Sequence, residues 1–230
     1  KRASAKVYRL AFYDPLTGLP NRQSFMARIS EAIRDASRNN CRFSVLYLDL
    51  DNFKRINDSL GHTLGDELLK VVSQRIDTCI REHDVTGRPH AAGPGPNPQM
   101  ARLGGDEFTV LLRDIESEND AHLVAERISN VVREPIVLQG RQFVFTSSVG
   151  VVTYPEDGTD MDTLIANADM AMYRAKDSGK NAVRSFSNTM YVRSLEYLDL
   201  ETDLRQAIAG AGLELHYQPK MNLKNNAITG

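Results

Sequence analysis

Hydrophobic positions recur along this chain with two periods, which predict alternating helices and strands. Apolar residues three and four positions apart lie on one face of a helix, whereas short β-rich apolar runs are typical of strands. The helical period predicts helices at about 3–13, 21–37, 64–82, 118–133, 161–177 and 189–210. The strand patterns predict strands at about 43–49, 100–103, 108–112, 136–138, 141–145, 148–153, 182–186 and 213–220. Tight turns at 104–106 and 139–140 predict two hairpins.

The order of these elements predicts an α/β (α+β) fold with a ferredoxin-like βαββαβ core, in which helices flank a mixed sheet. The hairpin at 100–112 requires antiparallel pairing, which disfavours the alternative of a doubly wound parallel sheet. The pattern of apolar and polar residues changes after Phe186, where a long predicted helix and the alternating run LELHYQPK follow. We therefore expect a domain boundary near residue 187.

Composition narrows the class of protein. The 230 residues carry 28 Lys and Arg against 30 Asp and Glu, a formal net charge of −2, which argues against binding nucleic acid through bulk positive charge. No apolar run approaches the ~18–20 residues that a membrane helix needs. Cys41 and Cys79 lie in apolar periodic segments without metal-ligand spacing, so we expect both to be reduced core thiols of a cytoplasmic protein.

Two further features concern the organisation of the chain. Residues 87–99, GRPHAAGPGPNPQ, hold four prolines and three glycines and predict a mobile surface insertion, because such a segment buries little apolar surface. The chain starts inside a helical pattern without a methionine and stops soon after a strand-like run. We therefore expect a piece of a longer polypeptide.

Acidic residues gather at the ends of two predicted strands. Asp49 and Asp51 end the first strand on one face, and Asp106 and Glu107 follow two glycines at a hairpin tip. If the strands are neighbours, these carboxylates repel one another and need a cation, and oxygen ligands of this kind select Mg²⁺ or Mn²⁺. Such ions bridge to phosphates, which indicates phosphoryl or nucleotidyl transfer. The alternative for Asp51 alone is that it caps the next helix.

Cationic and amide side chains suited to a nucleotide surround these acids in the sequence. Lys54 lies at a helix start, where free N–H groups suit phosphate. Lys176 and Lys180 lie near the end of the helix at 161–177, where a preference for cations at helix ends is the alternative explanation. Asn57 and Asp66 match a base edge, since Asn donates and accepts and a carboxylate accepts from guanine.

The chain resembles the GGDEF diguanylate cyclase family. The segments that carry the resemblance are DPLTGLPNR at 14–22, DLDNFKRINDSLGHTLGD at 49–66, ARLGGDEF at 101–108, SVGV at 148–151 and ADMAMYRAKDSGKN at 168–181. They occur in the family's order and cover about residues 10–186. The resemblance implies a five-stranded sheet close to the nucleotide-cyclase palm. It also implies a homodimer that converts two GTP into cyclic di-GMP and two pyrophosphates with Mg²⁺ or Mn²⁺.

The resemblance implies a role for individual residues. Those implied to bind the metal are Asp49, the Leu50 carbonyl and Asp106. Those implied to act in catalysis are Asp106, which helps to deprotonate the attacking 3′-hydroxyl, Glu107 and Lys54. Those implied to contact substrate are Asn52, Phe53, Asn57, His62, Asp66, Lys176 and Lys180.

Three positions carry qualifications. The alternative for His62 is a loop histidine that holds the backbone. Lys180 stands where the family often has Arg, so we expect weaker orientation of phosphate. Many family members carry an inhibitory Arg-x-x-Asp site five residues before the two glycines, where this chain has PNPQ at 96–99. Arg81 and Asp84 fit that motif further upstream, either as a working product site beside the insertion or as solvated charges.

Resemblances at the two ends predict the domain organisation. Residues 195–230 resemble the opening of an EAL phosphodiesterase domain, without its catalytic ligands. We expect 1–13 to be a linker helix after an upstream sensor domain, 14–187 to be the GGDEF domain and 188–230 to start a truncated EAL domain. Two functions stay open: an active diguanylate cyclase, or a catalytically silent GTP-binding domain that activates the adjoining EAL phosphodiesterase. A cyclic di-GMP receptor usually has a degenerate signature, unlike this chain.

Overall fold

The structure is a computed structural model that describes residues 2–82, 99–210, 216–222 and 227–228. The chain divides into two compact units, Lys1–Met190 and Tyr191–Gly230. The helices are α1 (Arg2–Phe12), α2 (Arg22–Asn39), α3 (Phe53–Leu60), α4 (His62–Glu82), α5 (Glu118–Arg133), α6 (Met161–Asp177) and α7 (Asn188–Ala209). The strands are β1 (Phe43–Leu50), β2 (Met100–Gly104), β3 (Glu107–Arg113), β4 (Ile136–Leu138), β5 (Arg141–Phe143), β6 (Ser147–Tyr154), β7 (Ala182–Ser185), β8 (Met221–Asn222) and β9 (Ala227–Ile228).

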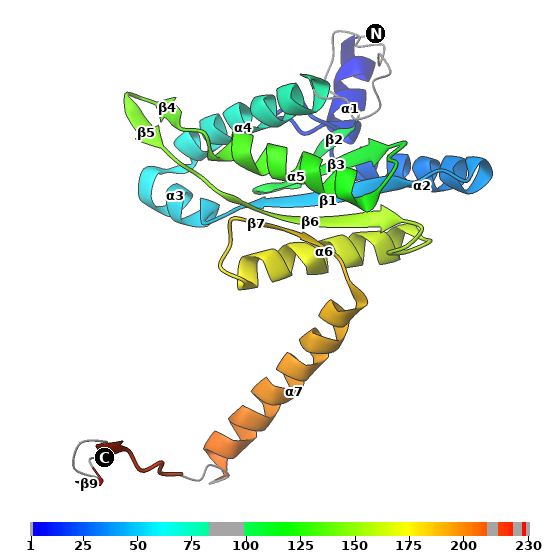
Figure 1. The fold of residues 1–230 in the computed structure, drawn as a ribbon. Coiled ribbons are helices and arrows are strands. Elements are labelled where there is room, and N and C mark those ends of the chain that lie inside the picture. The colour runs from blue at the N-terminus through cyan, green and yellow to red at the C-terminus, as the bar shows by residue number, and fades with distance from the viewer. Residues whose placement is uncertain (1, 83–98, 211–215, 223–226, 229–230) are drawn as a thin grey trace. The chain divides into compact units, whose positions relative to one another are not determined.

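A five-stranded mixed sheet organises the first unit, with the order β2-β3-β1-β6-β7 (Figure 1). The central strand β1 pairs antiparallel with β3 and β6, while β7 joins β6 in parallel. The predicted mixed sheet of about five strands is thus confirmed, and the doubly wound parallel alternative is wrong. A parallel sheet is excluded by the predicted hairpin, because β2 and β3 pair antiparallel through their tight turn.

Helices cover both faces of this sheet, which explains why β1 is buried along its whole length (Figure 1). Alternate β1 residues serve the two layers. Leu46 and Leu48 belong to the core with α4 and α5, whereas Phe43 and Val45 belong to the core with α2 and α6. The ends of β1 and β3 that carry the acidic residues are therefore fixed by two apolar layers.

Several helices of the first unit begin where a local side chain accepts an orphan amide hydrogen. Asn21 Oδ1 accepts from the Ser24 N–H at 3.1 Å and starts α2, as the sequence predicts. Asp160 Oδ1 accepts from the Thr163 N–H at 2.9 Å and starts α6. A glycine then lets α6 approach the sheet, because a Cβ at Gly150 of β6 would lie 2.2 Å from the Ala168 carbonyl oxygen.

Two expectations about the fold are wrong. Cys79 is buried, but Cys41 is exposed, because it lies in the turn that follows the left-handed residue Asn40 at the end of α2. The strand expected at 213–220 is also wrong where it can be assessed, since 216–220 form no regular structure and only the two-residue strands β8 and β9 pair nearby.

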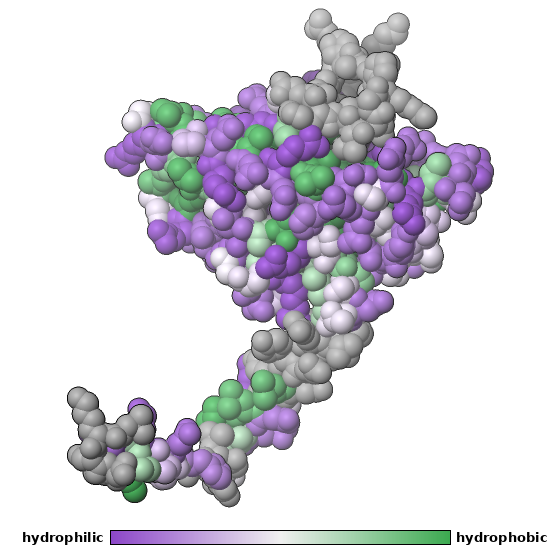
Figure 2. Space-filling view, in the orientation of Figure 1, coloured by the Kyte–Doolittle hydropathy of each residue, from purple (hydrophilic) through white to green (hydrophobic). Residues whose placement is uncertain are grey.

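The remaining expectations about organisation concern the insertion and α7. Residues 87–98 of the expected insertion lie outside the described residues, as does Asp84. In the second unit, Leu200, Leu204 and Ile208 are exposed along α7, and Figure 2 shows hydrophobic atoms gathered on this helix. Across the ranges that the structure describes, no helix is both long enough and apolar enough to cross a bilayer.

Candidate active site

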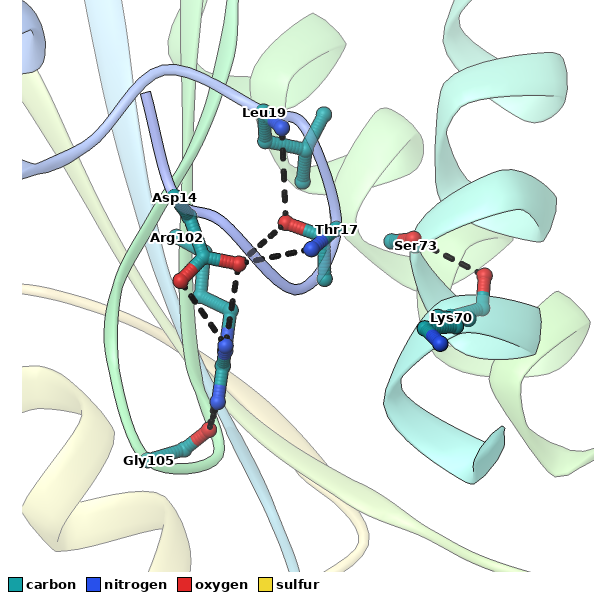
Figure 3. A network of polar contacts seen from close by, with 7 residues as sticks. All are labelled: Asp14, Thr17, Leu19, Lys70, Ser73, Arg102 and Gly105. Atoms are coloured by element: carbon teal, nitrogen blue, oxygen red, sulfur yellow. Dashed lines mark hydrogen bonds and ion pairs between the residues drawn. The ribbon is translucent and has the colours of Figure 1, made fainter. Parts of the chain in front are cut away.

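The turn between β2 and β3, which carries the Gly-Gly-Asp-Glu sequence, is braced from outside the hairpin. Arg102 Nε and Nη2 donate to the Gly105 carbonyl at 3.0 and 2.7 Å, and Arg102 Nη1 lies 3.0 Å from both carboxylate oxygens of Asp14 (Figure 3). Thr17 donates to Asp14 through its amide and hydroxyl, at 2.8 and 2.7 Å. Asp14 thus joins the turn before α2 to the turn that carries Asp106.

Sequence reasoning missed this brace, although the segment 14–22 is one of those that carry the family resemblance. The available signal was an Asp three residues before a Thr, which is typical of a side chain that caps its own turn. Burial raises the pKa of Asp14, but the hydrogen bonds from Thr17 and Arg102 outweigh it and hold the pKa below its usual value. The carboxylate therefore stays ionised beside Arg102.

The sheet brings the predicted acidic residues together at one end. Asp49 at the end of β1 pairs in register with Glu107 of β3, and the Leu50 N–H donates to the Asp106 carbonyl at 3.3 Å. Lys176, near the end of α6, places Nζ 2.6 Å from Asp49 Oδ2. Three segments far apart in the sequence therefore meet here. We call Asp49, Asp106, Glu107 and Lys176 the charged end of the site.

The charged end carries carboxylates that resist ionisation. Burial raises the pKa of Asp49, Lys176 opposes this effect, and the charge of Asp106 adds to it. Burial likewise raises the pKa of Asp106, against Lys176 and with a contribution from Glu107. A further cation beside this half-buried carboxylate pair would stabilise the ionised form of both groups.

Glu107 is fixed by a phenol from the neighbouring strand. Tyr47 OH donates to Glu107 Oε2 at 3.2 Å, and Tyr47 itself is buried. Burial, followed by the negative charge of Glu107, raises the pKa of Tyr47 well above its usual value, so the phenol stays a hydrogen-bond donor. The second acid of the signature therefore has a defined direction.

Asp51 does not cap α3; that alternative is wrong. Asp51 is 4% exposed, and its carboxylate accepts three hydrogen bonds. The donors are Thr146 Oγ1 at 2.6 Å, Ser148 Oγ at 2.7 Å and the Asn181 N–H at 2.9 Å. Asp51 thus ties the end of β1 to β6 and to the segment after α6, which explains why a second acid follows Asp49.

Residues 179–181, here named the Lys180 loop, bring a cation to the start of α3. Lys180 Nζ donates to Asn52 Oδ1 at 2.7 Å. Asn52 is the N-cap of α3 but its side chain caps no amide, so the first amides of α3, from Phe53 on, receive no side-chain cap there. Lys54 in the first turn is exposed. An anion would find amides and two lysines at this helix start.

The junction of α3 and α4 holds Asn57, His62 and Asp66, here named the base end. Asn57 Oδ1 is buried without a hydrogen-bond partner among the residues that the structure describes. It lies against Gly65, where a Cβ would come within 1.9 Å of it. His62 and Asp66 are exposed. A buried acceptor without a donor costs free energy, which a ligand with an N–H group would recover.

Some predicted residues have no demonstrated place in this arrangement. In the described part of the chain, no hydrogen bond or ion pair joins Lys54, His62 or Asp66 to the other candidate residues. Arg81 lies in the last turn of α4 with its side chain not described, and Asp84 is outside the described residues. The product-inhibition site therefore stays a prediction.

The donor set at the charged end fits a hard divalent cation. Among the described residues no group of three or more His, Cys, Asp and Glu is arranged to hold a metal. Two carboxylates and a main-chain carbonyl leave positions for phosphate oxygens, an arrangement that suits Mg²⁺, which commonly takes one or two carboxylates plus substrate phosphates. Asp49 and Asp106 are the carboxylates that fit this requirement, and the Leu50 carbonyl stays a predicted third ligand.

Comparison with known protein families identifies a match over most of the chain. Residues 11–92 and 95–182 match the family model described as diguanylate cyclase, GGDEF domain. The chain is 41% identical over 98% of its length to the cyclic di-GMP phosphodiesterase NbdA of Pseudomonas aeruginosa, and 40% identical over 79% of its length to the diguanylate cyclase TpbB of the same species. It spans 27% of the first relative and 39% of the second.

Solved structures share the fold. The GGDEF domain of TpbB superposes with a TM-score of 0.70 at 38% identity, over 80% of this chain and 99% of that one. The coiled coil and GGDEF domain of DgcB from Caulobacter crescentus, in complex with c-di-GMP, gives a TM-score of 0.66 at 26% identity, over 80% of this chain and 90% of that one.

Proposed function

Because this chain belongs to the GGDEF diguanylate cyclase family, we propose that its first unit is an active diguanylate cyclase. It condenses two GTP molecules into cyclic di-GMP and two pyrophosphates. The observation that carries this proposal is the convergence of Asp49, Asp106 and Lys176, with Lys176 Nζ 2.6 Å from Asp49 Oδ2. Paired carboxylates and a nearby ammonium are the groups that nucleotidyl transfer requires.

Asp106 accepts the proton of the attacking 3′-hydroxyl. Its raised pKa supports this role, because a carboxylate whose pKa lies closer to that of the hydroxyl is a better base. Glu107, oriented by Tyr47, adds negative charge beside it. Mg²⁺ held by Asp49, the Leu50 carbonyl and Asp106 supplies Lewis-acid stabilisation of the phosphate charge when bound.

The rest of the site binds and orients GTP. The amides near Asn52 and Phe53, with Lys54 and Lys180, hold the phosphates at the start of α3. Lys176 exchanges its contact with Asp49 for the terminal phosphates when the nucleotide binds. The guanine contacts the base end, where Asn57 and Asp66 offer complementary hydrogen bonds and His62 lines the same stretch.

Turnover requires two copies of the chain. The product contains two guanylate units, and each chain carries one set of the residues described above, so the two sites must face each other in a homodimer. The relatives TpbB and MucR, named as a diguanylate cyclase and as a bifunctional diguanylate cyclase/cyclic di-GMP phosphodiesterase, support a cyclase. Arg81 and Asp84 remain candidates for product inhibition, which Arg81→Ala would abolish.

A second function is a catalytically silent GTP-binding domain that activates an adjoining EAL phosphodiesterase. The names of two relatives favour it: NbdA and PdeR of Escherichia coli are cyclic di-GMP phosphodiesterases, each 41% identical to this chain over 98% and 96% of its length. Such a module uses the phosphate and guanine contacts without turnover. The intact acidic signature favours the cyclase.

One experiment separates the two functions. The chain, fused after a dimerising coiled coil, is incubated with GTP and Mg²⁺, and the nucleotides are resolved by chromatography. We expect cyclic di-GMP, lost in Asp106→Asn and retained in the control Asp162→Asn, an exposed acid in the first turn of α6. Tight GTP binding without product in the dimer would reject the cyclase and favour the regulatory module.

A further inference from the structure

A polar cavity of about 400 Å³ lies between α5 and β7, the strand at one edge of the sheet. Ser129, Asn130 and Arg133 line it from α5, and Asn181 and Arg184 line it from the β7 side. None of the residues at the charged end or the base end lines this cavity. It is therefore a separate feature of the first unit, within the range of volumes typical of small-molecule sites.

The cavity has more positive than negative charge on its walls. Within the described ranges, neither Arg133 nor Arg184 has a carboxylate within ion-pair distance. The acidic residue that lines the cavity, Glu126, instead lies 3.7 Å from His122 Nε2. Arg184 donates to the Val183 carbonyl of the edge strand at 3.1 Å and to Ser178 Oγ at 3.3 Å, which accounts for one arginine as protection of the edge. Edge protection does not explain Arg133, which projects from α5.

Arg133 connects the cavity to the Lys180 loop. Its Nη2 donates to Asn181 Oδ1 at 2.9 Å, and the Asn181 N–H donates to Asp51 Oδ2 at 2.9 Å. Lys180 and Asn181 both have left-handed backbone, with φ of 64° and 48°, which is uncommon for residues other than glycine. Hydrogen bonds at both ends of Asn181 therefore hold a strained loop in the conformation that directs Lys180 to Asn52.

We propose that this cavity is a second binding site, for a small phosphate-bearing molecule, and that its occupant controls the Lys180 loop. The Arg133 guanidinium, a serine hydroxyl and asparagine amides form a donor set suited to phosphate, and Arg184, which donates to Val183 and Ser178, adds positive charge on the β7 side. The cavity is larger than one phosphate group, so the site takes a phosphorylated metabolite of about sugar-phosphate size. The phosphate of this molecule replaces the neutral Asn181 Oδ1 as the acceptor for Arg133. The Lys180 loop then loses one of its hydrogen bonds, and GTP binding weakens.

Binding is tested by NMR on the ¹⁵N-labelled chain, titrated with ribose 5-phosphate, with inorganic phosphate and with ribose alone. The phosphates should move the amide signals of Ser129, Asn130, Ala182 and Val183 with saturation, and ribose should not. Arg133→Gln and Arg184→Gln should each weaken this binding by at least about tenfold. Arg141→Gln, at an exposed arginine of β5, is the matched control.

The outcomes separate the two phosphate sites. Shifts confined to Phe53 and Lys54 would place the phosphate only at the start of α3 and overturn the proposal, as would equal shifts with ribose. If ribose 5-phosphate binds more strongly than inorganic phosphate, the site takes a ligand of sugar-phosphate size. Equal binding of the two would overturn that part of the proposal. These readouts need no cyclase activity, so they stand whether or not the proposed function does.

The control of the loop rests on the proposed function and has its own measurement. Affinity for a fluorescent GTP analogue is measured with and without saturating ribose 5-phosphate. We expect a loss of about threefold in the native chain and none in Arg133→Gln. Unchanged affinity in the native chain would overturn the coupling.

Discussion

The charged end and the base end of the site differ in how far they are organised before any ligand is present. At the charged end nearly every polar group already has a partner: Lys176 contacts Asp49, and Tyr47 contacts Glu107. At the base end, His62 and Asp66 are exposed, and the buried Asn57 Oδ1 has no partner in the part of the chain described. The two ends belong to one site, but the polar groups of the charged end are mostly paired before a ligand binds, whereas those of the base end are exposed or lack a partner among the described residues.

This difference has a physical cause. Like charges held close together in a half-buried place must be neutralised and fixed, or the fold loses stability. The exposed side chains of His62 and Asp66 carry no such requirement, because water satisfies them, and the neutral Asn57 Oδ1 costs less to leave without a donor than a buried charge would. Substitutions at the charged end should therefore affect stability as well as catalysis, whereas those at the base end should act mainly on substrate binding. Four predictions test this contrast, from the largest effect to the smallest.

Removal of the buried carboxylate next to the charged end should give the largest loss of stability. Asp51→Ala leaves Thr146, Ser148 and the Asn181 amide without their acceptor, so we expect a loss of about 3 kcal/mol in the free energy of unfolding. Urea denaturation measures this. Asp58→Ala, at an exposed acid of α3, should change stability by less than about 0.5 kcal/mol, and equal losses would contradict the prediction.

A steric change should disable the base end. In Gly65→Ala the new Cβ would lie 1.9 Å from Asn57 Oδ1, so the asparagine must move. We expect the KM for GTP to rise by about 30-fold with a smaller change in kcat, because substrate binding is lost more than transition-state stabilisation. Ser59→Ala, on the exposed surface of α3, is the control, and an unchanged KM would remove Asn57 from the site.

Removal of one exposed acid should relax the choice of base. Asp66→Ala deletes an acceptor suited to the guanine N1–H and amino group, so we expect the preference for GTP over ATP to fall by about tenfold. Competition binding of the two nucleotides measures the preference, and the denaturation midpoint should not move. A preference that stays constant would exclude Asp66 from base recognition.

The brace between Asp14 and Arg102 should give a small, pH-dependent effect. Hydrogen bonds hold the folded pKa of Asp14 below its unfolded value, so the carboxylate stabilises the fold above about pH 4 and loses this contribution as the pH falls through the lower, folded pKa. Asp14→Asn should cost about 1 kcal/mol or less at pH 6 after solvent screening. The gap from the native chain should shrink on acidification; a gap that widens would contradict the assignment.

Most secondary structure followed from local pattern. Helices α5 and α6 begin and end where the apolar period predicts, and the hairpins at 100–112 and 136–145 follow from turn residues between short apolar runs. Such elements are predictable because their capping and turn interactions span only a few residues. The error at Cys41 came from the same source, since a periodic pattern does not reveal where the helix ends and the exposed turn begins.

For the charged end, the sequence predicted the chemical type of the residues but not the contacts that support them. Asp49, Asp106, Glu107 and Lys176 carried the right chemistry in the sequence, and pairing of β1 with β3 places the acids together. The supporting contacts were not predictable, because they join residues distant in sequence. Arg102 lies 88 residues from Asp14, and Asn181 lies 130 residues from Asp51.

The amino-acid sequence by itself determined the elements, the family resemblance and the type of chemistry, since these depend on local periodicity and on residue identity. Only the tertiary structure decided that Asp51 is an acceptor at the junction of three segments and that Asn57 Oδ1 has no donor among the described residues. It also placed Arg133 beside the Lys180 loop. The reason is physical: a polar side chain acquires its role from the partners that folding brings within about 3 Å, and no local pattern records them.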